Sequence, residues 1–588
     1  KDNKKSFRMI KRFTFVKKGF PFKFDLSILK TSKYNVKLKR YITEYNVTNA
    51  DLFNNLESYE VELEMLNVSA KRLEFKDLMN KLKRGIMIIL SALQNTNYPI
   101  PYTECEKVLL EYTIIANRAT KDKKDKLFEP NKKGHDIRKN RKNFIGPSSI
   151  TLEAENIISI SNMDNRIIPN INMPYTVTDK ADGYRKLLYV STQGKIYLID
   201  INMNVEFTGS ITKNKSYFKT IIDGEHIYHD KKGNFINLYM CFDIYFKNGK
   251  DIRKYPLLLM DDMKYENDNI DKTKCRYDEL NIVVNKLEVK SIIKNKISSI
   301  TIKSKEFYNN ISESIFKSCR TILNKVDDDG FLYETDGLIF TPINKSVGSD
   351  KLGDKVHKKT WIHSLKWKPP EFNTIDFLVT TKKNPEGNDL IKNLFQSGNN
   401  FNDMNNGILK YKVLELRVGF DEKKHGFLNP FDDVLNDNIP DSSTEYDRNS
   451  YKPVLFQPTE PTPNYDIYNC NMLLKDNGNG ENMYIEDNSE VFEGDMIVEF
   501  KFDKDKEEGW QWIPIRVRHD KTADYKRGNR NYGNAYHVAE SVWKSIHNPI
   551  TRELITSDDK EIKYESDEVY YKKTNKKTTT KSLRDFHN

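Results

Sequence analysis

The sequence predicts a mixed α+β protein of several domains in which strands outnumber helices. A chain of 588 residues exceeds the size at which one hydrophobic core stops growing, so we expect it to divide into domains. Runs rich in Val, Ile, Tyr and Phe, bounded by Gly, Asn and Asp, recur along the chain and predict antiparallel strands joined by turns. Helical spacing of apolar residues is confined to a few segments.

Composition limits the class of protein and its partners. Hydrophobic residues make up 37% of the chain and charged residues 31%, which is typical of a soluble globular protein with polar insertions. No apolar run is long enough to span a bilayer, so we expect no membrane partner. The net charge of +11 favours a polyanionic partner such as RNA, but only weakly, because it is diluted over a long chain. Five cysteines without CxxC spacing suit a reducing compartment and argue against a zinc site.

The region 1–118 contains a strand with an acidic face. Its residues alternate so that Glu60, Glu62 and Glu64 would share one side of a strand. Three neighbouring carboxylates repel one another unless a cation lies between them, and Mg²⁺ or Mn²⁺ prefers oxygen ligands. A solvated edge strand with charged outer residues explains the pattern about equally well.

The same region contains a basic strand and two helices. Arg8, Lys11 and Arg12 form a basic run suited to phosphate contact, with a solvated face as the alternative. Apolar residues at helical spacing predict helices over 71–93 and 103–116. Because the chain opens on lysine rather than methionine and shows no secretory signal, we expect its true start to lie upstream.

Charge and turn residues divide the rest of the chain. Residues 119–143 are charged and poor in apolar residues, which predicts a linker. Strand runs dominate 144–375. The region 376–525 is also rich in strands, and its long polar loops suit an OB-type barrel. Residues 526–588 end in a Lys- and Thr-rich tail that we expect to be disordered. Further predicted helices fall at 278–287, 309–326 and 534–547, and the long polar loops at 384–407 and 436–451.

The most informative stretch is the motif around Lys180, which lies between two β-prone runs. The lysine ends the first run and is followed by Asp182, Gly183 and Arg185. A lysine acts as a nucleophile when its amine is unprotonated, and nearby cations or a metal ion lower its pKa toward that state. Taken alone, the pattern K-x-D-G fits a solvated β-turn better than an active site.

Five further motifs follow this one in order. They are Asp223-Gly224-Glu225, Phe242-Asp243-Ile244, Thr335-Asp336-Gly337, Lys366-Trp367-Lys368 and the segment 512–521. The series resembles the covalent nucleotidyltransferase superfamily, and within it the mRNA capping guanylyltransferases. It is most similar to the multidomain capping enzymes of large cytoplasmic DNA viruses, such as mimiviruses, asfarviruses and poxviruses. The resemblance covers most of the chain, and six motifs in order are highly specific.

The resemblance implies a covalent nucleotidyltransferase domain over 144–375 that uses GTP as substrate and Mg²⁺ or Mn²⁺ as cofactor. Lys180 would attack the α-phosphate and hold GMP as a phosphoramidate. Asp336 would bind the metal, and Glu225 would help to bind the ribose or the metal. Arg185 would contact the ribose or the acceptor end. The nucleotide-binding residues implied in all are Asp182, Gly183, Arg185, Glu225, Phe242, Lys366, Lys368, Arg516, Arg518, Asp520 and Lys521.

Individual roles follow from the same resemblance. Phe242 would stack on guanine, although an aromatic residue in a strand more often belongs to the core. Lys366 and Lys368 would hold the α-phosphate and lower the pKa of Lys180. The segment 512–521 would reach the β- and γ-phosphates only when the barrel closes about a hinge at 370–376. Asp223 is predicted only to hold a turn with Gly224.

The resemblance also implies that 1–118 is the C-terminal part of a tunnel-type, metal-dependent RNA triphosphatase barrel. Glu60, Glu62 and Glu64 would bind the metal, whereas Arg8 and Arg12 would bind phosphate. The family's basic strand alternates Arg-x-Lys-x-Arg, but here Ile10 occupies the middle position, and no counterpart of the family's early glutamate strand is found.

The implied partners are GTP, the 5′ end of nascent viral mRNA and a methyltransferase domain or subunit outside this chain. The implied location is the host cytoplasm, in a viral factory, or the virion. Two alternatives stay open: an ATP-dependent RNA or DNA ligase, which shares the lysine and most motifs, and a non-catalytic RNA-binding scaffold. The glutamate strand and the form of the motif around Lys366 favour capping over ligation.

Overall fold

A computed structural model confirms the predicted mixed α+β class, with many strands and few helices. The described residues are 3–35, 40–50, 52–53, 55, 57–67, 73–117, 143–158, 168–261, 271–293, 299–311, 314–354, 359–395, 408–426, 428, 434–435, 451–476, 480–485 and 490–557. The predicted linker 119–143 lies outside them except for its last residue, and the predicted tail lies outside them from residue 558 onward.

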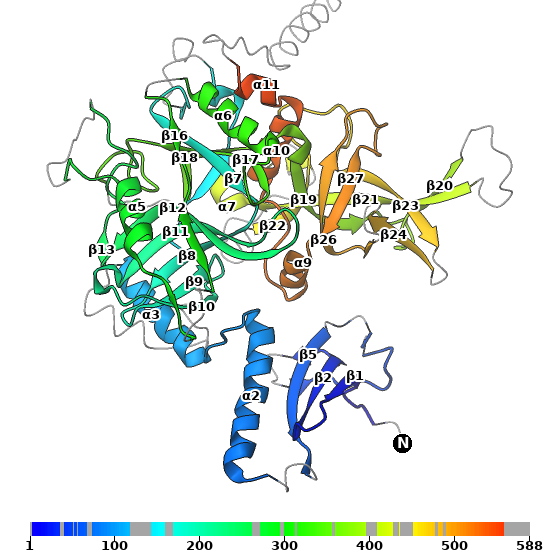
Figure 1. Cartoon of the computed structure of the whole chain (residues 1–588). Helices are drawn as coiled ribbons and strands as arrows, with labels where there is room; N and C mark the ends of the chain where they lie inside the picture. The colour runs from blue at the N-terminus through cyan, green and yellow to red at the C-terminus, as the bar shows by residue number, and fades with distance from the viewer. Residues whose placement is uncertain are drawn as a thin grey trace, which may run out of the picture.

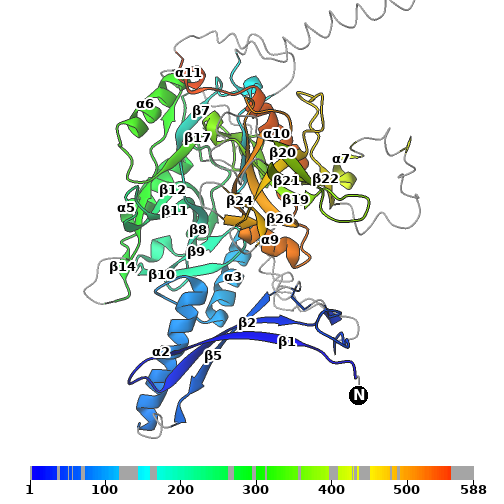
Figure 2. The same cartoon turned by 90° about the vertical axis from the view of Figure 1, so that its right-hand side faces the viewer.

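The N-terminal part is a small antiparallel sheet that is covered on one face by a long helix (Figures 1 and 2). Its strands β1 (Arg8–Val16), β2 (Phe22–Thr31) and β5 (Glu57–Met65) pair in the order β1-β2-β5, and β3 (Tyr34–Asn35) pairs with β4 (Arg40–Tyr41). Helix α2 (Phe75–Gln94) contacts the sheet at Gly85, where an added Cβ would lie 2.8 Å from a Leu63 methyl group. The helix predicted at 71–93 is therefore confirmed, with its start at Phe75.

Helix α3 (Tyr102–Asn117) joins this sheet to the central part of the molecule. Its buried residues Val108, Leu109 and Tyr112 pack against the large central sheet. The Tyr112 hydroxyl donates a hydrogen bond of 2.8 Å to the carbonyl of Asn143, where the described chain resumes. The helix predicted at 103–116 is confirmed.

Two sheets form the central part, and the chain passes from one to the other directly after Lys180. The first contains β6 (Ser148–Thr151), β7 (Tyr175–Ala181), β16 (Tyr308–Asn309), β17 (Thr335–Pro342) and β18 (Thr360–Trp367), in the order β16-β7-β17-β18-β6. The second contains β8 (Tyr184–Val190), β9 (Lys195–Asp200), β10 (Val205–Ile211), β11 (Thr220–His229), β12 (Phe235–Lys247), β13 (Lys250–Asp251), β14 (Lys290–Ser291) and β15 (Thr301–Ser304). Its order is β13-β12-β11-β8-β9-β10-β14, and β15 runs parallel to β12. The turn Asp182-Gly183 therefore links two different sheets.

Two helices pack on these sheets, α5 (Arg276–Lys286) and α6 (Ile315–Asp327), with short 3₁₀ turns at η3 (Ala154–Asn156) and η5 (Lys215–Tyr217). The helix predicted at 278–287 is confirmed. The helix predicted at 309–326 begins only at Ile315, because residues 308–309 form β16 against β7 and Ser314 caps the helix through its side chain. Apolar spacing cannot reveal such a strand pairing in advance.

A further sheet follows the short turn η6 (Pro370–Phe372). It contains β19 (Thr374–Thr381), β20 (Ile391–Phe395), β21 (Ile408–Asp421), β22 (Tyr451–Leu455), β23 (Asn469–Asp476), β24 (Glu481–Ile485), β25 (Glu490–Phe492), β26 (Met496–Phe502) and β27 (Trp512–Val517). Its main path runs β25-β24-β23-β21-β19-β26-β27, and Glu490 of β25 accepts hydrogen bonds from Val517 of β27 and bonds His519. The two edge strands thus meet, and the sheet is nearly closed around an aromatic core. β20 lies inside the predicted loop 384–407, which is a correction.

The C-terminal helices bridge this barrel-like sheet and the central part. They are α9 (His519–Lys526), α10 (Tyr536–His547) and α11 (Arg552–Ile555), and the short helix α7 (Glu422–His425) precedes them. Trp543 of α10 is buried in the barrel core, whereas Ile555 of α11 is buried beside α6. The helix predicted at 534–547 is confirmed, with its start at Tyr536. Among the described residues, no helix is both long enough and apolar enough to cross a membrane.

Candidate active site

Lys180 lies near the end of β7, where its amine contacts a carboxylate from the neighbouring strand β17. The Nζ atom lies 2.5 Å from Oδ1 of Asp336, and Nζ of Lys368 lies 2.7 Å from Oδ2 of the same side chain. Burial alone would raise the pKa of Asp336, but the two ammonium groups outweigh it and lower that pKa. Asp336 therefore holds two lysines, one of which is the predicted nucleophile.

A cavity of about 260 Å³ opens beside Lys180. Its walls come from β7, β8, β11, β12 and β18, so strands distant in the sequence meet there. The predicted residues that line it are Lys180, Arg185, Glu225, Phe242 and Lys366. The structure thus brings five of the predicted residues together around one space.

Glu225 lines this cavity together with two further carboxylates, those of Asp179 and Asp243. Burial raises its pKa to about 7, against the opposing charges of Lys305, Lys180 and Arg185. Among the described residues, no group forms a hydrogen bond or ion pair with its carboxylate. Gly183 makes this packing possible, since a Cβ there would lie 2.9 Å from Cγ of Glu225 and 2.9 Å from the carbonyl oxygen of His226.

Arg185 is bound to the buried carboxylate of Asp223. Its Nε and Nη2 atoms donate to Asp223 at 3.1 and 2.5 Å, and Nη1 donates to the carbonyl of Pro147 at 2.8 Å. Burial would lower the pKa of Arg185, but Asp223 outweighs it and raises that pKa. Asp223 is fully buried within β11, so the prediction that it only holds a turn is wrong.

Phe242, in the motif Phe242-Asp243-Ile244, faces the cavity rather than the core. Phe242 is partly exposed on β12, and the guanidinium of Arg185 lies 5.6 Å from its ring centre. The next residue, Asp243, is buried and bonded to Arg276 at 2.8 Å. Asp243 also lines the cavity, although its side chain is buried and paired with Arg276.

Lys366 and Lys368 have different surroundings. Lys366 lines the cavity, and burial together with the charges of Lys368 and Lys180 lowers its pKa. Lys368 lies just beyond β18, is bound to Asp336, and does not line this cavity. Trp367, between them, is buried and donates to the carbonyl of Ile550 at 2.7 Å.

Sequence reasoning missed Lys305, a buried lysine on the cavity wall. Its amine donates to the carbonyl and the carboxylate of Asp179 at 2.6 and 2.8 Å, and the Tyr333 hydroxyl donates to the same carboxylate at 3.1 Å. No local signal marks this residue, because the parallel pairing of β15 with β12 brings it to the site. Lys305 thus fixes the backbone of Asp179, the residue before Lys180.

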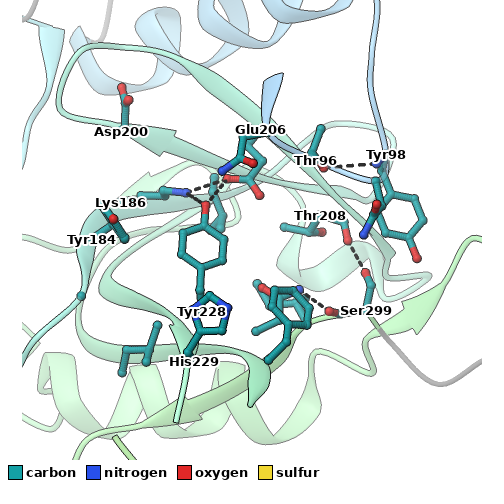
Figure 3. Close-up of a pocket in the computed structure, with 18 of the residues that line it drawn as sticks. Thr96, Tyr98, Tyr184, Lys186, Asp200, Glu206, Thr208, Tyr228, His229 and Ser299 are labelled. Atoms are coloured by element: carbon teal, nitrogen blue, oxygen red, sulfur yellow. Dashed lines mark hydrogen bonds and ion pairs between the residues drawn. The ribbon is translucent and has the colours of Figure 1, made fainter. Parts of the chain in front are cut away.

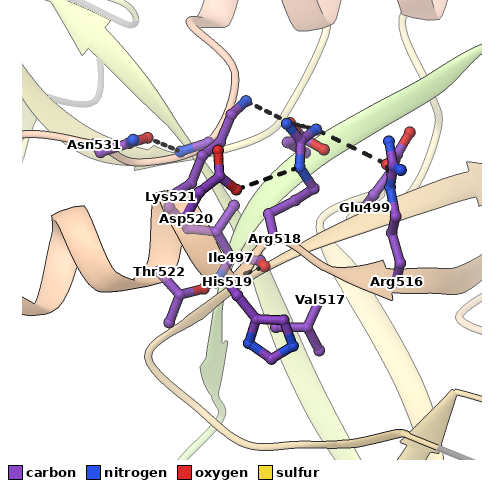
Figure 4. A network of polar contacts seen from close by, with 12 residues as sticks. Ile497, Glu499, Arg516, Val517, Arg518, His519, Asp520, Lys521, Thr522 and Asn531 are labelled. Carbon is purple, nitrogen blue, oxygen red and sulfur yellow. Dashed lines mark hydrogen bonds and ion pairs between the residues drawn. The ribbon is translucent and has the colours of Figure 1, made fainter. Parts of the chain in front are cut away.

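The predicted cations of 512–521 form a separate network on the barrel-like sheet (Figure 4). Arg516 is 2.5 Å from Glu499, whereas Asp376 accepts from Arg518 at 2.7 Å and from Lys521 at 2.5 Å. Asp520 lies 3.8 Å from Arg518. None of these side chains lines the Lys180 cavity. Arg516, Arg518, Asp520 and the turn residue Asp182 line a second, larger cavity instead.

The predicted metal face of the N-terminal sheet is neutralised by cations. Glu60 pairs with Arg8 at 2.8 Å, Glu62 with Arg12 at 3.2 Å, and Glu64 with Lys23 at 2.8 Å. The three glutamates do lie on one face, opposite Ser27, Asp25 and Lys23 of β2. Within the described part of the chain, no three His, Cys, Asp or Glu side chains are grouped so as to hold a metal ion.

Comparison with known proteins gives a consistent result for the central part. The family model of the mRNA capping enzyme catalytic domain matches residues 117–370. The chain is 28% identical over 537 residues to the probable mRNA-capping enzyme of Acanthamoeba polyphaga mimivirus, covering 85% of this chain and 38% of that protein. It is 27% identical over 230 residues to the mRNA-capping enzyme of Caenorhabditis elegans, covering 36% of this chain and 32% of that one.

The chain thus spans about a third of the length of these two relatives. A solved structure named "Pmar-Lig_Pre." is 15% identical and covers 46% of this chain and 53% of its own, with a TM-score of 0.23, too low to bear on the fold. The matched segment contains Lys180, Glu225, Phe242, Asp336 and Lys366, whose geometry is given above. Residues 117–370 are therefore similar to the catalytic domain of mRNA capping enzymes.

Proposed function

We propose that this chain is an mRNA guanylyltransferase that transfers GMP from GTP to the diphosphate end of RNA through a lysyl-GMP intermediate on Lys180. The observation that carries the proposal is the joining of Lys180, Glu225, Phe242 and Lys366 around one cavity. This cavity lies within the segment that matches the catalytic domain of capping enzymes.

The lining residues support a division of tasks during nucleotide binding. Phe242 offers an exposed ring face for the guanine base, backed by the guanidinium of Arg185. Glu225 offers an acceptor for the ribose hydroxyls. Lys366 is desolvated and lies next to other cations, so an anionic α-phosphate would relieve an unfavourable arrangement of charge.

The proposed reaction has two displacements at the α-phosphorus. The Lys180 ammonium group first loses a proton to solvent. The neutral amine then forms the P–N bond and releases a second proton to solvent, while the bond to the bridging oxygen breaks and pyrophosphate leaves. A terminal oxygen of the RNA diphosphate then attacks the same phosphorus. The P–N bond breaks, and Lys180 regains a proton.

Glu225 and Asp336 are the proposed metal-binding residues. Mg²⁺ commonly binds one or two carboxylates together with substrate phosphates, which these two side chains fit, although Asp336 must first release its lysines. When bound, the metal ion would supply positive charge to the reacting phosphate. Mn²⁺ has the same ligand preference.

Arg516, Arg518, Asp520 and Lys521 are proposed to reach the leaving phosphates only after the barrel moves toward Lys180. The three cations among them are now paired with Glu499 and Asp376 of the barrel-like sheet, and Asp520 lies near Arg518. The proposed domains are 144–375 for the nucleotidyltransferase and 376–525 for an OB-type barrel, with the hinge at 370–376. The short turn η6 and the start of β19 occupy that hinge.

For region 1–118 we retain the proposal of a partial RNA triphosphatase of the tunnel type. The ion pairs of Glu60 with Arg8 and of Glu62 with Arg12 support it, because such a face combines metal and phosphate ligands. Metal binding there requires the glutamates to leave their ion pairs. The proposed setting is the host cytoplasm or virion, with viral mRNA and a methyltransferase as partners.

A labelling experiment tests the main proposal against the ligase and scaffold alternatives. The protein is incubated with Mg²⁺ and α-labelled GTP or ATP, denatured, and examined for bound label. We expect label from GTP alone; label from ATP would instead establish the ligase, and no label the scaffold. Lys180→Ala removes the amine that carries the label, so labelling should fall by at least about a thousandfold. Lys410→Ala, which removes an exposed lysine of β21, should retain it.

A further inference from the structure

The larger cavity, of about 1610 Å³, adjoins the turn that follows Lys180. Asp182 and Gly183 belong both to that turn and to the cavity wall. Figure 3 shows other residues of the lining, among them Tyr184, Lys186 and Tyr228. Three parts of the chain enclose it: the segment from Asn95 to Tyr98, the sheet of β8 to β12, and β27 with Arg516. Its volume exceeds the range of about 300–1,000 Å³ that is usual for small-molecule sites. It therefore suits an extended ligand.

The wall formed by the segment from Asn95 to Tyr98 is held in place by packing. The Tyr98 ring meets Phe207 edge-on, with centroids 6.4 Å apart. It also lies against Gly209, where an added Cβ would approach the ring to 2.6 Å. The side chain of Gln94 forms two hydrogen bonds with the backbone of Ile100, at 2.8 and 3.1 Å. The wall is thus a fixed part of the fold.

The floor of the cavity is a buried polar network. Lys186 is 8% exposed, and its amine lies 2.6 Å from Glu206, 2.9 Å from the Tyr228 hydroxyl and 3.0 Å from Nδ1 of His226. Burial and the Lys186 charge lower the pKa of His226 to about 4, so this imidazole is neutral at pH 7. The network fixes the Tyr228 ring, on which Tyr184 packs edge-on with centroids 5.5 Å apart.

Two aromatic side chains of the lining are unusually exposed. Tyr184 is 63% exposed and Phe235 is 62% exposed, although each stands on a strand of the buried central sheet. Both have a neighbouring ring for support, namely Tyr228 and His229. Exposed rings held in place by packing are the usual platforms on which single-stranded nucleic acids stack their bases.

The charges around the cavity favour one kind of ligand. Arg516 and Arg518 lie at its β27 side, whereas Asp182, Asp200 and Glu206 lie at the sheet side. The carboxylates disfavour a compact polyphosphate on the floor, but they can accept hydrogen bonds from ribose hydroxyls and base amino groups. A single-stranded nucleic acid would match both sides of the cavity if its bases faced the carboxylates of the floor and its phosphates faced the two arginines.

We propose that this cavity binds the first nucleotides of the acceptor RNA, directly downstream of the end that receives GMP. The inference rests on the proposed guanylyltransferase function, which requires such an acceptor near Lys180. It adds the place where the strand lies and the stacking residues, Tyr184 and Phe235. Substituting Tyr184 or Phe235 should leave the nucleotide cavity beside Lys180 unchanged, because neither residue lines that cavity.

Equilibrium binding of a fluorescently labelled single-stranded RNA, followed by anisotropy without GTP, tests the site directly. Tyr184→Ala should weaken RNA binding by about 5- to 100-fold, the usual loss for one stacked base, and Phe235→Ala should act in the same direction. Tyr184→Trp should restore binding. Tyr102→Ala is the matched control, since that tyrosine is 55% exposed but lies outside the cavity, and it should bind RNA as the parent does.

A second readout separates this site from the proposed function. GMP transfer from isolated enzyme–GMP to RNA should fall in Tyr184→Ala, more for a long acceptor than for a diphosphate-ended dinucleotide. Unchanged RNA affinity in both Tyr184→Ala and Phe235→Ala would overturn the site while leaving lysine labelling intact. Conversely, weaker RNA binding in a protein that forms no enzyme–GMP would support the site and refute the guanylyltransferase.

Discussion

At the scale of single residues, the site depends on carboxylates with opposite surroundings. Asp336 has two ammonium groups within hydrogen-bonding distance, which lower its pKa and keep it ionised. Glu225 is buried without such a partner among the described residues, and its pKa rises to about 7. Asp336 therefore restrains the amine of Lys180, whereas Glu225 changes charge near neutral pH.

The raised pKa of Glu225 predicts a pH dependence. The folded protein holds this proton between the ordinary glutamate pKa of 4.5 and about 7, whereas the unfolded chain has lost it. Stability should therefore fall as the pH rises through this window, by up to about 3 kcal/mol. Glu225→Gln should remove this slope. Urea unfolding of both proteins at several pH values measures it, and parallel curves would contradict the assignment.

The same residue predicts the pH profile of lysine labelling. If ionised Glu225 binds ribose or metal, labelling by GTP should rise as the pH passes about 7. In Glu225→Gln this rise should be lost along with most of the activity. The initial rate of enzyme–GMP formation is the measurement, at saturating GTP to exclude simple changes in affinity.

At the scale of elements, one buried carboxylate of the barrel-like sheet, that of Asp376, binds two cations. Asp376 near the start of β19 binds Arg518 and Lys521, whose side chains come from the end of β27 and from α9. The backbone N–H of Asp376 donates to Asn534 at 2.7 Å, which ties the strand to the segment before α10. This arrangement holds Arg518 and Lys521 on one carboxylate, and Arg518 also lines the large cavity.

Removing the charge of Asp376 should destabilise the barrel. Asp376→Asn leaves two partly buried cations without their partner, and we expect a loss of about 2–4 kcal/mol. Asp389→Asn is the control: Asp389 also binds two lysines, Lys383 and Lys412, but is more exposed, so its loss should be about 1 kcal/mol or less. Chemical denaturation compares the two, and equal losses would argue against a special role for Asp376.

At the scale of the whole molecule, the C-terminal segment connects the barrel-like sheet to the central part. Ser541 of α10 donates to Glu153 at 2.8 Å, and Arg552 of α11 pairs with Asp327 at the end of α6. Any closure of the barrel toward Lys180 must therefore move about these contacts as well as about 370–376. The barrel-like sheet and the central part are thus connected by the proposed hinge and by these non-covalent contacts of the C-terminal segment.

Ile555→Ala tests this attachment. Ile555 is fully buried in the core that contains α6, so its truncation should cost about 2–4 kcal/mol and loosen the C-terminal segment. Hydrogen exchange should become faster in α11 and α6, with little change in the barrel strands. Val538→Ala, at a position that is 36% exposed, should leave exchange in both helices as in the parent.

Much of the site follows from local sequence, because each motif carries its own chemistry. The order of the motifs identified Lys180, Glu225, Phe242 and Lys366, and all four line one cavity. Strand and helix types were also predictable, since periodicity is a property of neighbouring residues. The misplaced start of α6 and the strand β20 are exceptions, because pairing with distant strands decided them.

The sequence by itself determined the α+β class, and it placed Lys180, the proposed nucleophile, in one series with Glu225, Phe242 and Lys366. Only the tertiary structure decided that Arg185 is bound to Asp223, that Lys305 supports the site, and that the cations of β27 lie with Asp376 and Glu499 rather than with Lys180. The physical reason is that these contacts depend on register and on the packing of one sheet against another. Residue spacing along the chain does not specify either.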